Sequence, residues 1–261
     1  MSTQTLPRIS EQDKQQYHEE GYFILERVIP DEHLQMLRAE CQTFIDKKDA
    51  EMDARGQSVE GITHKGKRYF ISNRYRESQR MREFIFSPLM AEICRATLGD
   101  DAYLFNEQWV VKGAEQGMKF AWHQDSGYVG FPHRPYLTCW CTLDDVSEAN
   151  GTAYILPHSR AGTREKIFSH VVEQGSNDLV GYHGDDPGIP IIAPAGSIAC
   201  FSSYTFHRSG ANTTPNLRRI YLPQYGREPI VKPNGQLLHF AVPFLRDGKV
   251  IYDAEQDVVD A

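Results

Sequence analysis

The sequence lacks the features that would direct a chain into a membrane or onto nucleic acid. Its 261 residues contain no apolar run of about 18 residues or more, the length that a transmembrane helix needs. Lysine and arginine total 28 against 35 aspartates and glutamates, a formal net charge of −7, and no block of basic residues is present. Because a phosphate backbone is bound by such a basic surface, nucleic acid is excluded as the main partner.

Cysteine is scarce and follows no metal-binding or disulfide pattern. The five cysteines are odd in number and include no C-x-x-C pair: Cys41, Cys94, Cys139, Cys141 and Cys200. The opening stretch "MSTQTLPRISEQDKQQ" has no apolar segment of the kind found in signal peptides, and the closing "DVVDA" is not a peroxisomal address. We therefore expect reduced, mostly buried thiols in a cytoplasmic protein.

The first hundred residues indicate helices. Ser10 can begin a helix that ends at Gly21, and apolar residues spaced by three and four from Leu34 to Ile45 form one helical face. A further helix is predicted for "PLMAEICRATLG", which ends at Gly99. Residues 48–68 are polar and predict a mobile loop between these helices. This part of the chain, residues 1–100, is expected to support a second, different half.

Residues 101–250 indicate β-strands. Short segments rich in β-branched and aromatic residues are separated by Gly, Pro, Asn or Asp, among them "AYLFNEQWVVKG", "PYLTCWCTLDDV", "TAYILPHS", "GSIACFSSYTFHRSG" and "RRIYLPQYG". Helices followed by many short strands predict an α+β chain, mainly β, with helices packed on one side of a sandwich or barrel. The polar segment 161–193 is expected as an insertion at the barrel rim, near the active site. We expect a single domain over residues 1–261.

Two histidines and one aspartate have the pattern of metal ligands. The stretch "FAWHQDSGY" places His123 and Asp125 two residues apart at a strand end, so alternation turns both side chains to one face. His207 ends a later apolar strand, "SIACFSSYTF", which can run beside the first. Such a set is the facial triad of non-haem Fe(II) oxygenases, since it leaves neighbouring coordination positions open. The other histidines considered as surface or core residues are His18, His33, His64, His170 and His239.

A co-substrate site is indicated just beyond the distal histidine. A glycine-containing turn after His207 leads into a strand that begins with two arginines. An arginine near such a metal can bind the far carboxylate of a dicarboxylate in a bidentate fork, while the other end of the dicarboxylate chelates the metal. The pair His-x-Asp alone is a weak signal, but its combination with a distal His, a Ser and an Arg is a strong one.

This combination resembles the phytanoyl-CoA dioxygenase family of Fe(II)/2-oxoglutarate oxygenases, which includes ectoine hydroxylases. The matching stretches are "WHQDSGY", "WCTLDDVSEANGTAYILPHSR" and "HRSGANTTPNLRR", which span roughly residues 101–225, and the N-terminal "YHEEGYFILERVIPDEHLQMLR" is also similar. The resemblance implies a double-stranded β-helix core, that is, a cupin-like jelly roll. It also implies Fe(II), 2-oxoglutarate as co-substrate, and O2.

The resemblance also assigns residues to these roles. The family's iron ligands fall on His123, Asp125 and His207. Its 2-oxoglutarate arginine falls on Arg218, eleven residues past the distal histidine, and its companion serine on Ser209. Positions that line the co-substrate pocket in other members match Trp140, Gln108 and Asn106. Strand alternation then turns Arg219 to the opposite face, where it is expected as a surface or ion-pair arginine.

Other positions are left open by the sequence. The group that holds the metal-side carboxylate of 2-oxoglutarate has three candidates: Lys112, Lys67 and Arg68. The loop "SGYVGFPHRPY" is expected over the substrate, with substrate contacts at Tyr128, Phe131 and His133, although Tyr128 and Phe131 would equally serve to pack the barrel rim.

The resemblance implies hydroxylation of an unactivated C–H bond in a small molecule or biosynthetic intermediate, with release of succinate and CO2. Related halogenases lack the carboxylate ligand, so Asp125 disfavours chlorination, whereas desaturation, cyclisation and epoxidation stay open. One alternative is a non-oxidative cupin-like metalloenzyme, which would gather more histidines and need no Arg–Ser pair. Another is a catalytically idle binding module, whose mark would be the loss of a triad residue or the arginine. The oligomeric state, monomer or homodimer, is open.

Overall fold

The structure, a computed structural model, describes residues 9–257. The expectations about a leader and a C-terminal address rest largely on residues 1–8 and 258–261, which lie outside the described residues. Between residues 9 and 257, none of the helices combines the length and the apolar character that crossing a membrane would require.

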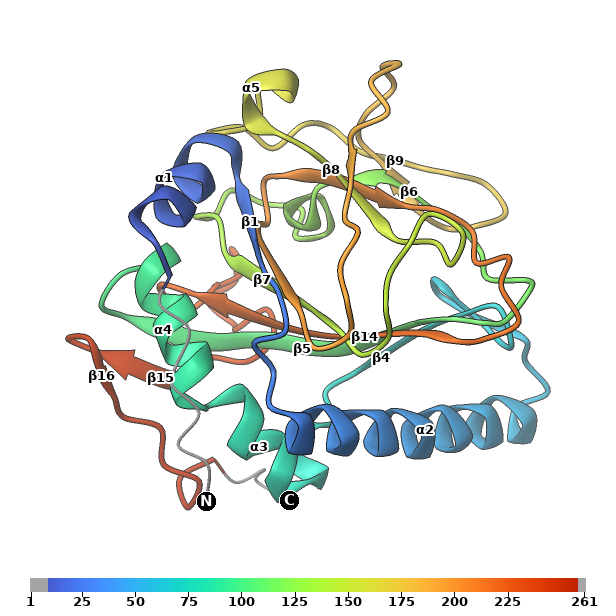
Figure 1. Cartoon of the computed structure of the whole chain (residues 1–261), viewed down its shortest axis with the longest axis horizontal. Helices are drawn as coiled ribbons and strands as arrows, with labels where there is room; N and C mark the ends of the chain where they lie inside the picture. The colour runs from blue at the N-terminus through green and yellow to red at the C-terminus, as the bar shows by residue number, and fades with distance from the viewer. Residues whose placement is uncertain (1–8, 258–261) are drawn as a thin grey trace.

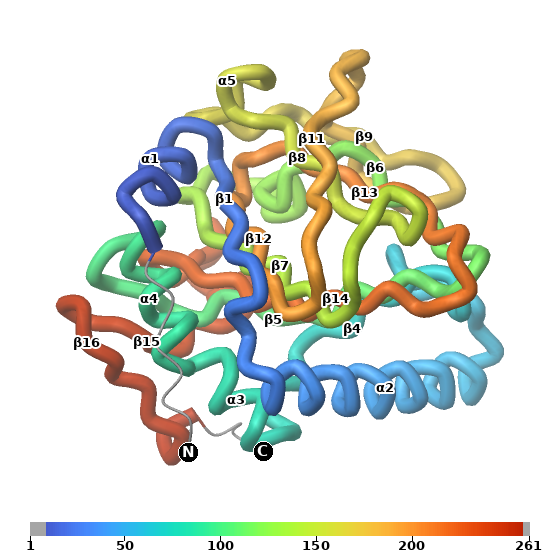
Figure 2. Tube along the Cα trace, viewed as in Figure 1, coloured from blue at the N-terminus to red at the C-terminus, as the bar shows by residue number. Residues whose placement is uncertain are grey.

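Two antiparallel sheets face each other and form the core (Figures 1 and 2). The major sheet has the order β1 (Tyr22–Leu25), β12 (Ile198–Ser202), β7 (Leu137–Thr142), β14 (Arg218–Gly226), β5 (Ala102–Lys112), β4 (Arg68–Ser72), β3 (Thr63–His64) and β2 (Val59–Glu60), with β15 (Val242–Arg246) also paired to β5 and β16 (Lys249–Val250) paired to β15. The minor sheet has the order β11 (Ile189–Pro190), β8 (Ala153–Leu156), β13 (Phe206–Ser209) and β6 (Phe120–His123). The predicted jelly-roll class, mainly β with flanking helices, is confirmed.

Helices cover the outer face of the major sheet (Figure 1). They are α1 (Glu11–Glu20), α2 (Asp31–Ala54), α3 (Gln79–Ile85) and α4 (Pro88–Thr97). The shorter elements are the 3-10 turns η1 (Tyr75–Glu77) and η2 (Asp125–Tyr128), the one-turn helix α5 (His158–Ala161), and the strand pair β9 (Val171–Val172) and β10 (Leu179–Val180). The helices therefore support one sheet and leave the space between the sheets to the site.

The first helix begins and ends where the sequence predicts. The Ser10 hydroxyl accepts a hydrogen bond from the Asp13 amide at 3.1 Å, and the Asp13 carboxylate accepts one from the Ser10 amide at 2.9 Å, which is a capping box. Gly21 ends the helix in the left-handed region at φ 85°, and a Cβ at this position would lie 2.3 Å from the Thr205 hydroxyl. Glycine is therefore required there both for the turn and for the close approach to the sheet.

The predicted mobile loop over residues 48–68 is wrong in its first and last parts. Helix α2 continues to Ala54 because Lys48 and Met52 extend its buried face, and the Lys48 ammonium pairs with Glu60 at 2.6 Å. Residues 59–64 form the hairpin of β2 and β3, which continues into β4 and so joins the major sheet. The local sequence is polar, but tertiary pairing with β5 outweighs that local signal.

One predicted strand, "SIACFSSYTF", is in fact two strands in different sheets. β12 pairs with β7 in the major sheet, whereas β13 begins at Phe206 and pairs with β6 and β8 in the minor sheet. The turn between them, at residues 203–205, moves the chain from one sheet to the other. His207 therefore lies directly opposite His123 as its Cα partner.

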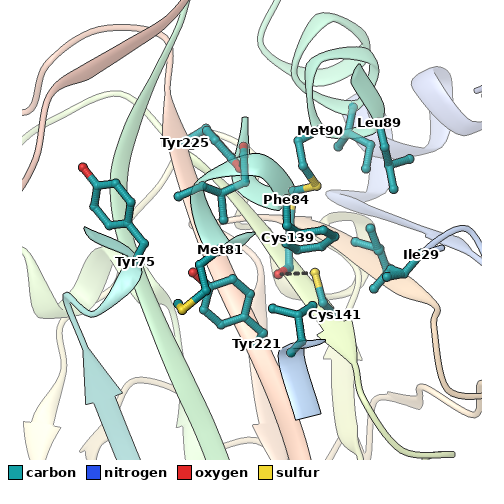
Figure 3. Packing of buried hydrophobic residues seen from close by; sticks show 14 of the residues in the cluster. Ile29, Tyr75, Met81, Phe84, Leu89, Met90, Cys139, Cys141, Tyr221 and Tyr225 are labelled. Atoms are coloured by element: carbon teal, nitrogen blue, oxygen red, sulfur yellow. Dashed lines mark hydrogen bonds between the residues drawn. The ribbon is translucent and has the colours of Figure 1, made fainter. Parts of the chain in front are cut away.

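Strand alternation sorts the side chains of the major sheet between two environments. Trp109 and Tyr221 face the helices, where Phe84 of α3 lies 6.2 Å from Tyr221 between ring centroids (Figure 3). Val110 and Ile220, each one residue away, face the minor sheet and pack in a separate cluster. The same inward face carries the polar residues of the site, so the β-period fixes which residues can reach it.

Candidate metal centre and its two cavities

Three side chains converge between the two sheets. His123 at the end of β6, Asp125 at the start of η2, and His207 on β13 offer ligand atoms that all lie within 4.8 Å of one another. The Asp125 Oδ1 atom is 3.6 Å from Nε2 of His123 and 3.4 Å from Nε2 of His207. The predicted grouping of these three residues is therefore present, and a single ion could be reached by all of them.

Both imidazoles are oriented by their own strands. Nδ1 of His123 lies 2.8 Å from the Ala121 carbonyl, and Nδ1 of His207 lies 3.1 Å from the Thr205 carbonyl. Since each Nδ1–H donates to a backbone oxygen, each Nε2 is left as a lone-pair donor toward the centre. Burial, with a contribution from the neighbouring His207, lowers the pKa of His123 to about 4, so its imidazole is neutral at physiological pH.

Asp125 is held as a carboxylate in a fixed position. Burial alone would raise the pKa of Asp125, but His207 and His123 outweigh it and hold that pKa well below its usual range. The second oxygen, Oδ2, accepts hydrogen bonds from the Thr138 hydroxyl at 2.7 Å and the Gln224 amide at 3.0 Å. Oδ1 is therefore the oxygen directed at the histidines. A deprotonated carboxylate and a neutral imidazole are the protonation states that a divalent cation requires.

Two cavities meet at this triad. We call the first the arginine cavity, lined by Arg68, Phe70, Gln108, Val110, Lys112, Phe120, His123, Asp125, Trp140, Ala153, His207, Arg208, Ser209, Arg218 and Leu222. We call the second the aromatic cavity, lined by Ile62, Phe70, Ser72, Phe105, Asn106, Gln108, Phe120, His123, Asp125, Tyr128, Val129, Tyr136, Gln224, Leu238 and His239. Five residues belong to both: Phe70, Gln108, Phe120, His123 and Asp125.

Arg218 lines the arginine cavity as a buried cation that forms no salt bridge with any carboxylate of residues 9–257. It is 1% exposed, and its guanidinium donates only to backbone carbonyls, that of Gly151 at 3.2 Å and that of Val110 at a long 3.5 Å. Its Nε has no hydrogen-bond partner among the described residues. Burial lowers the pKa of Arg218 to about 9, which still leaves it charged at neutral pH. A buried, partly unpaired guanidinium fits the carboxylate of a bound anion.

Lys112 is a second buried basic residue in the same cavity. It is the Cα partner of Arg218 across β5 and β14, is 1% exposed, and donates to the Met118 carbonyl. Burial and the neighbouring guanidiniums of Arg218 and Arg68 hold the pKa of Lys112 well below its usual range. Among residues 9–257, Asp125 is the only carboxylate that lines the arginine cavity, and the histidines already engage it.

The other basic candidates have different partners. Arg68 is paired with the buried Asp178 at 2.6 and 3.1 Å, and its remaining donors reach backbone carbonyls. Lys67 is exposed and does not line either cavity within the described chain. Arg208 stacks on Tyr154, with 3.7 Å between the guanidinium carbon and the ring centroid. Lys112 and Arg218 are thus the two buried basic residues of the arginine cavity that form no salt bridge with a carboxylate among residues 9–257.

The structure places the remaining predicted residues as follows. Trp140 and Ser209 line the arginine cavity, and Arg218 lies 5.6 Å from the Trp140 ring centroid. Gln108 lines both cavities, whereas Asn106 lines the aromatic cavity only. Arg219 is turned to the other face, where it pairs with Asp144 at 2.6 Å.

Of the three predicted substrate contacts, Tyr128 lines the aromatic cavity, whereas Phe131 and His133 do not. Tyr128 lines the aromatic cavity and is 41% exposed. Phe131 and His133 do not line that cavity within the described chain; His133 contacts the Ser126 hydroxyl at 2.9 Å, and Phe131 packs beside Val129 and Tyr136.

Sequence reasoning missed several residues of the site. Gln224 and Thr138 hold the metal-facing carboxylate, and His239, which the sequence indicated as a surface or core residue, lines the aromatic cavity. A signal for Gln224 and Thr138 was available in the alternation of their strands, because both lie on the inward face shared with Arg218 and Trp140. No comparable signal exists for His239, since it comes from an irregular segment.

The fold and the site together define a class. A double-stranded β-helix with a two-His-one-carboxylate centre, beside a cavity that holds uncompensated cations, is the arrangement of non-haem iron oxygenases that use a 2-oxo-dicarboxylate.

Known proteins are consistent with this class. The family model for phytanoyl-CoA dioxygenase (PhyH) matches residues 17–220. Ectoine dioxygenase of Bordetella parapertussis is 26% identical over 261 residues, covering 85% of this chain and 80% of that protein. Peroxisomal phytanoyl-CoA dioxygenase of Rattus norvegicus is 22% identical over 238 residues, covering 84% and 68%. The solved apoform of EctD from S. alaskensis shares the fold, with a TM-score of 0.67 at 19% identity, over 93% of this chain and 86% of that one.

The chain belongs to the phytanoyl-CoA dioxygenase (PhyH) family, because the family model spans most of its length. It is an Fe(II)- and 2-oxoglutarate-dependent oxygenase, as the sequence predicted. Its relatives named for ectoine and phytanoyl-CoA act on small molecules.

Proposed function

We propose that this oxygenase hydroxylates an unactivated C–H bond of a small molecule, with His123, Asp125 and His207 as its iron ligands. The observation that carries the co-substrate assignment is the pair of buried cations, Arg218 and Lys112, that share one cavity beside the triad without a carboxylate partner. Unpaired buried charges are costly, so such a pair persists where an anion completes it.

The donor set fits iron and 2-oxoglutarate. When bound, they supply the oxidation, in which O2 is consumed and 2-oxoglutarate is converted to succinate and CO2. The protein contributes the geometry around that chemistry. His123 and His207 present Nε2, and Asp125 presents Oδ1 while Thr138 and Gln224 occupy its other oxygen. These hydrogen bonds keep the carboxylate from turning, which holds one face of the metal centre open to small ligands.

Arg218 and Lys112 bind the far carboxylate of 2-oxoglutarate. Ser209 and Trp140 complete this end, the first as a hydroxyl donor and the second as a wall. Lys112 lies four residues along β5 from Gln108, which is about 13 Å at strand spacing. Because Gln108 lines both cavities beside the triad, this separation supports a place for Lys112 at the far end of the co-substrate.

Gln108 is the group proposed for the metal-side carboxylate. Its amide oxygen accepts only a long hydrogen bond, 3.5 Å, from Ser72, and its amide nitrogen has no partner among residues 9–257. Of the three basic residues that the sequence offered, Arg68 is engaged by Asp178, Lys67 is exposed, and Lys112 lies at the other end. The donor proposed for the metal-side carboxylate is therefore the uncharged amide of Gln108.

Asp125 also bears on the reaction outcome. With the carboxylate in place, a halide has no vacated ligand position, so hydroxylation is proposed over chlorination. Desaturation, cyclisation and epoxidation need the same residues and differ in how the substrate is placed. The proposed setting is a single catalytic domain over residues 1–261 whose 161–193 insertion shapes the rim, where the Leu179 amide donates to the Tyr128 hydroxyl at 3.1 Å.

A reducing cytoplasmic setting is part of the proposal, supported by five cysteines that are all free and buried. The proposed partner is a small-molecule substrate, and neither nucleic acid nor a membrane is proposed as a partner. The oligomeric state, monomer or homodimer, is open.

The test is anaerobic addition of Fe(II) and then 2-oxoglutarate to the purified protein, followed by the weak visible absorption of an iron-chelated keto acid. We expect the band in the wild type and in the exposed control Arg134→Met, and its loss at the same 2-oxoglutarate concentration in Arg218→Met. Folded wild-type protein that binds Fe(II) but gives no band would overturn the proposal.

A further inference from the structure

The aromatic cavity has almost no charge of its own. Apart from the triad members His123 and Asp125, no lysine, arginine, aspartate or glutamate of residues 9–257 lines it. His239 has a pKa lowered by burial and by Lys232, so it is neutral at physiological pH. Arg68, Lys112, Arg208 and Arg218 line the arginine cavity and not this one.

Asp125 cannot serve as the counter-ion of a charged substrate. Its Oδ1 is directed at the two histidines, and its Oδ2 accepts from Thr138 and Gln224. Both oxygens are therefore engaged before a substrate arrives. An ionic substrate group would lose its hydration in this cavity without finding a partner.

Aromatic rings form much of the lining, which also includes the polar side chains of Ser72, Gln108 and Gln224. Phe70 and Phe120 lie 5.2 Å apart between ring centroids, and Phe105 and Tyr136 lie 4.7 Å apart. The volume of the cavity is about 220 Å³, below the roughly 300–1,000 Å³ of pockets that enclose drug-sized ligands. The cavity is therefore suited to one ring system or a compact alicyclic group.

One lining residue of this cavity carries a buried hydrogen-bond acceptor that has no partner among residues 9–257. The Asp125 carboxylate can only accept, so the nitrogen of the Gln224 amide must face it, at 3.0 Å. The Gln224 oxygen then accepts from the Asn106 amide nitrogen, also at 3.0 Å. The remaining atom, Asn106 Oδ1, is buried and has no hydrogen-bond partner among the described residues. The orientation of the Asn106 amide thus follows from the charge of Asp125.

We propose that the substrate portion inside the aromatic cavity is an uncharged ring or alicyclic group with an N–H or O–H that donates to Asn106 Oδ1. The proposal rests on the proposed function, because it takes this cavity to be the substrate side of the oxygenase centre. The relay from Asp125 through Gln224 to Asn106 then couples substrate position to the metal ligand. A compound without this donor would leave the buried acceptor without a hydrogen bond, and its binding would be weaker for that reason.

The experiment compares charge-matched sets of small compounds. Each set keeps one skeleton (benzyl, indolyl or cyclohexyl) and varies the group between carboxamide, carboxylate and aminomethyl; the indolyl set is indole-3-acetamide, indole-3-acetate and tryptamine. Binding to the protein carrying Zn(II) and 2-oxoglutarate is titrated by saturation-transfer NMR. In at least one set we expect the carboxamide to bind more tightly than both charged partners by about tenfold or more.

Variants test the role of the acceptor. Asn106→Leu removes the acceptor and is expected to weaken carboxamide binding by about tenfold or more. Asn234→Leu, the same change in an exposed loop, is expected to leave it unchanged. Thermal unfolding of each variant establishes that it is folded.

Several results would overturn the inference. These are carboxylates that bind best, amines that bind best through the aromatic faces, no difference within any set, or binding by no set. A carboxamide preference that survives Asn106→Leu would remove the assigned acceptor. The proposed function fails by a different measurement, since loss of the keto-acid band with Fe(II) is read without any of these compounds.

Discussion

Lys112 and Arg218 are directly paired residues on adjacent antiparallel strands, and both line one buried cavity beside the triad. Each is 1% exposed, and neither forms a hydrogen bond with a carboxylate of the part of the chain that the structure describes. Like charges so placed repel and lower each other's tendency to hold a proton. A dianionic co-substrate would relieve that repulsion, which is the physical basis for the proposed ligand site.

The change Lys112→Met should weaken 2-oxoglutarate binding while leaving a keto acid without the second carboxylate unaffected. Loss of one charge-assisted hydrogen bond costs about 1.5–3 kcal/mol, or roughly a 10- to 150-fold rise in Kd. The comparison ligand is 2-oxovalerate, whose terminal methyl replaces the far carboxylate. Calorimetric titration of the Fe(II) protein under anaerobic conditions measures both.

Lys67→Met is the matched control for this prediction, because Lys67 is exposed and lines neither cavity in the described range. An equal loss of affinity for 2-oxoglutarate and 2-oxovalerate in Lys112→Met would assign the lysine to folding of the pocket. An unchanged Kd for both would remove it from the site.

His207→Ala and Asp125→Ala should each abolish tight Fe(II) binding. Removal of an outer hydrogen bond to a metal ligand already costs about 10–100-fold in metal affinity, so loss of a ligand atom is expected to exceed that range. Iron content after anaerobic dialysis is the measurement. His18→Ala, an exposed histidine on α1, serves as the control. Full iron content in His207→Ala would refute the ligand assignment.

Thr138→Val tests the hydrogen bond that holds the second oxygen of Asp125. The Thr138 hydroxyl donates to Oδ2 at 2.7 Å and is fully buried, and valine keeps the shape without the donor. We expect metal affinity to fall by about 10–100-fold with the fold intact. Thr43→Val on the exposed face of α2 is the control. If metal affinity held and only the melting temperature fell, Thr138 would have a packing role.

Glu107 should make stability depend on pH. Burial raises the pKa of Glu107 to about 7, although the Arg74 and Tyr75 amides donate to its Oε1. Because this exceeds the unfolded value of about 4.3, the native state holds an extra proton between the two values. The stabilising contribution is full below about pH 4.3 and is lost as the pH rises through 7, a change on the order of 3 kcal/mol.

The measurement is urea unfolding at several pH values from 5 to 8 in the wild type and in Glu107→Gln. Glutamine cannot titrate, so the difference in free energy of unfolding between the two proteins should shift in favour of the variant as the pH rises. Glu165→Gln, an exposed carboxylate, should show no such shift. Parallel pH profiles for wild type and Glu107→Gln would contradict the raised pKa.

Much of the fold was determined by local patterns in the sequence. The limits of α1 follow from a capping serine and a left-handed glycine, and β5 and β14 follow from alternating apolar residues. The exceptions are segments in which distant partners decide the outcome. Residues 48–54 are polar, yet they stay helical because Met52 is buried and Lys48 meets Glu60. The stretch 198–209 is continuous in pattern but divides between two sheets.

The site divides in the same way. The sequence by itself determined the residue types and their order: a His-x-Asp, a distal His, and an Arg eleven residues later. Strand alternation sets the face only for His123, His207 and Arg218, because Asp125 lies in the 3-10 turn η2. Only the tertiary structure decided the charge balance. It pairs Arg68 with Asp178, leaves Lys112 with Arg218, and fixes the Asn106 acceptor through Gln224. These three pairings depend on which strands lie side by side. Local sequence patterns do not show them, because the hydrogen bonds and the burial arise between segments that are distant in the chain.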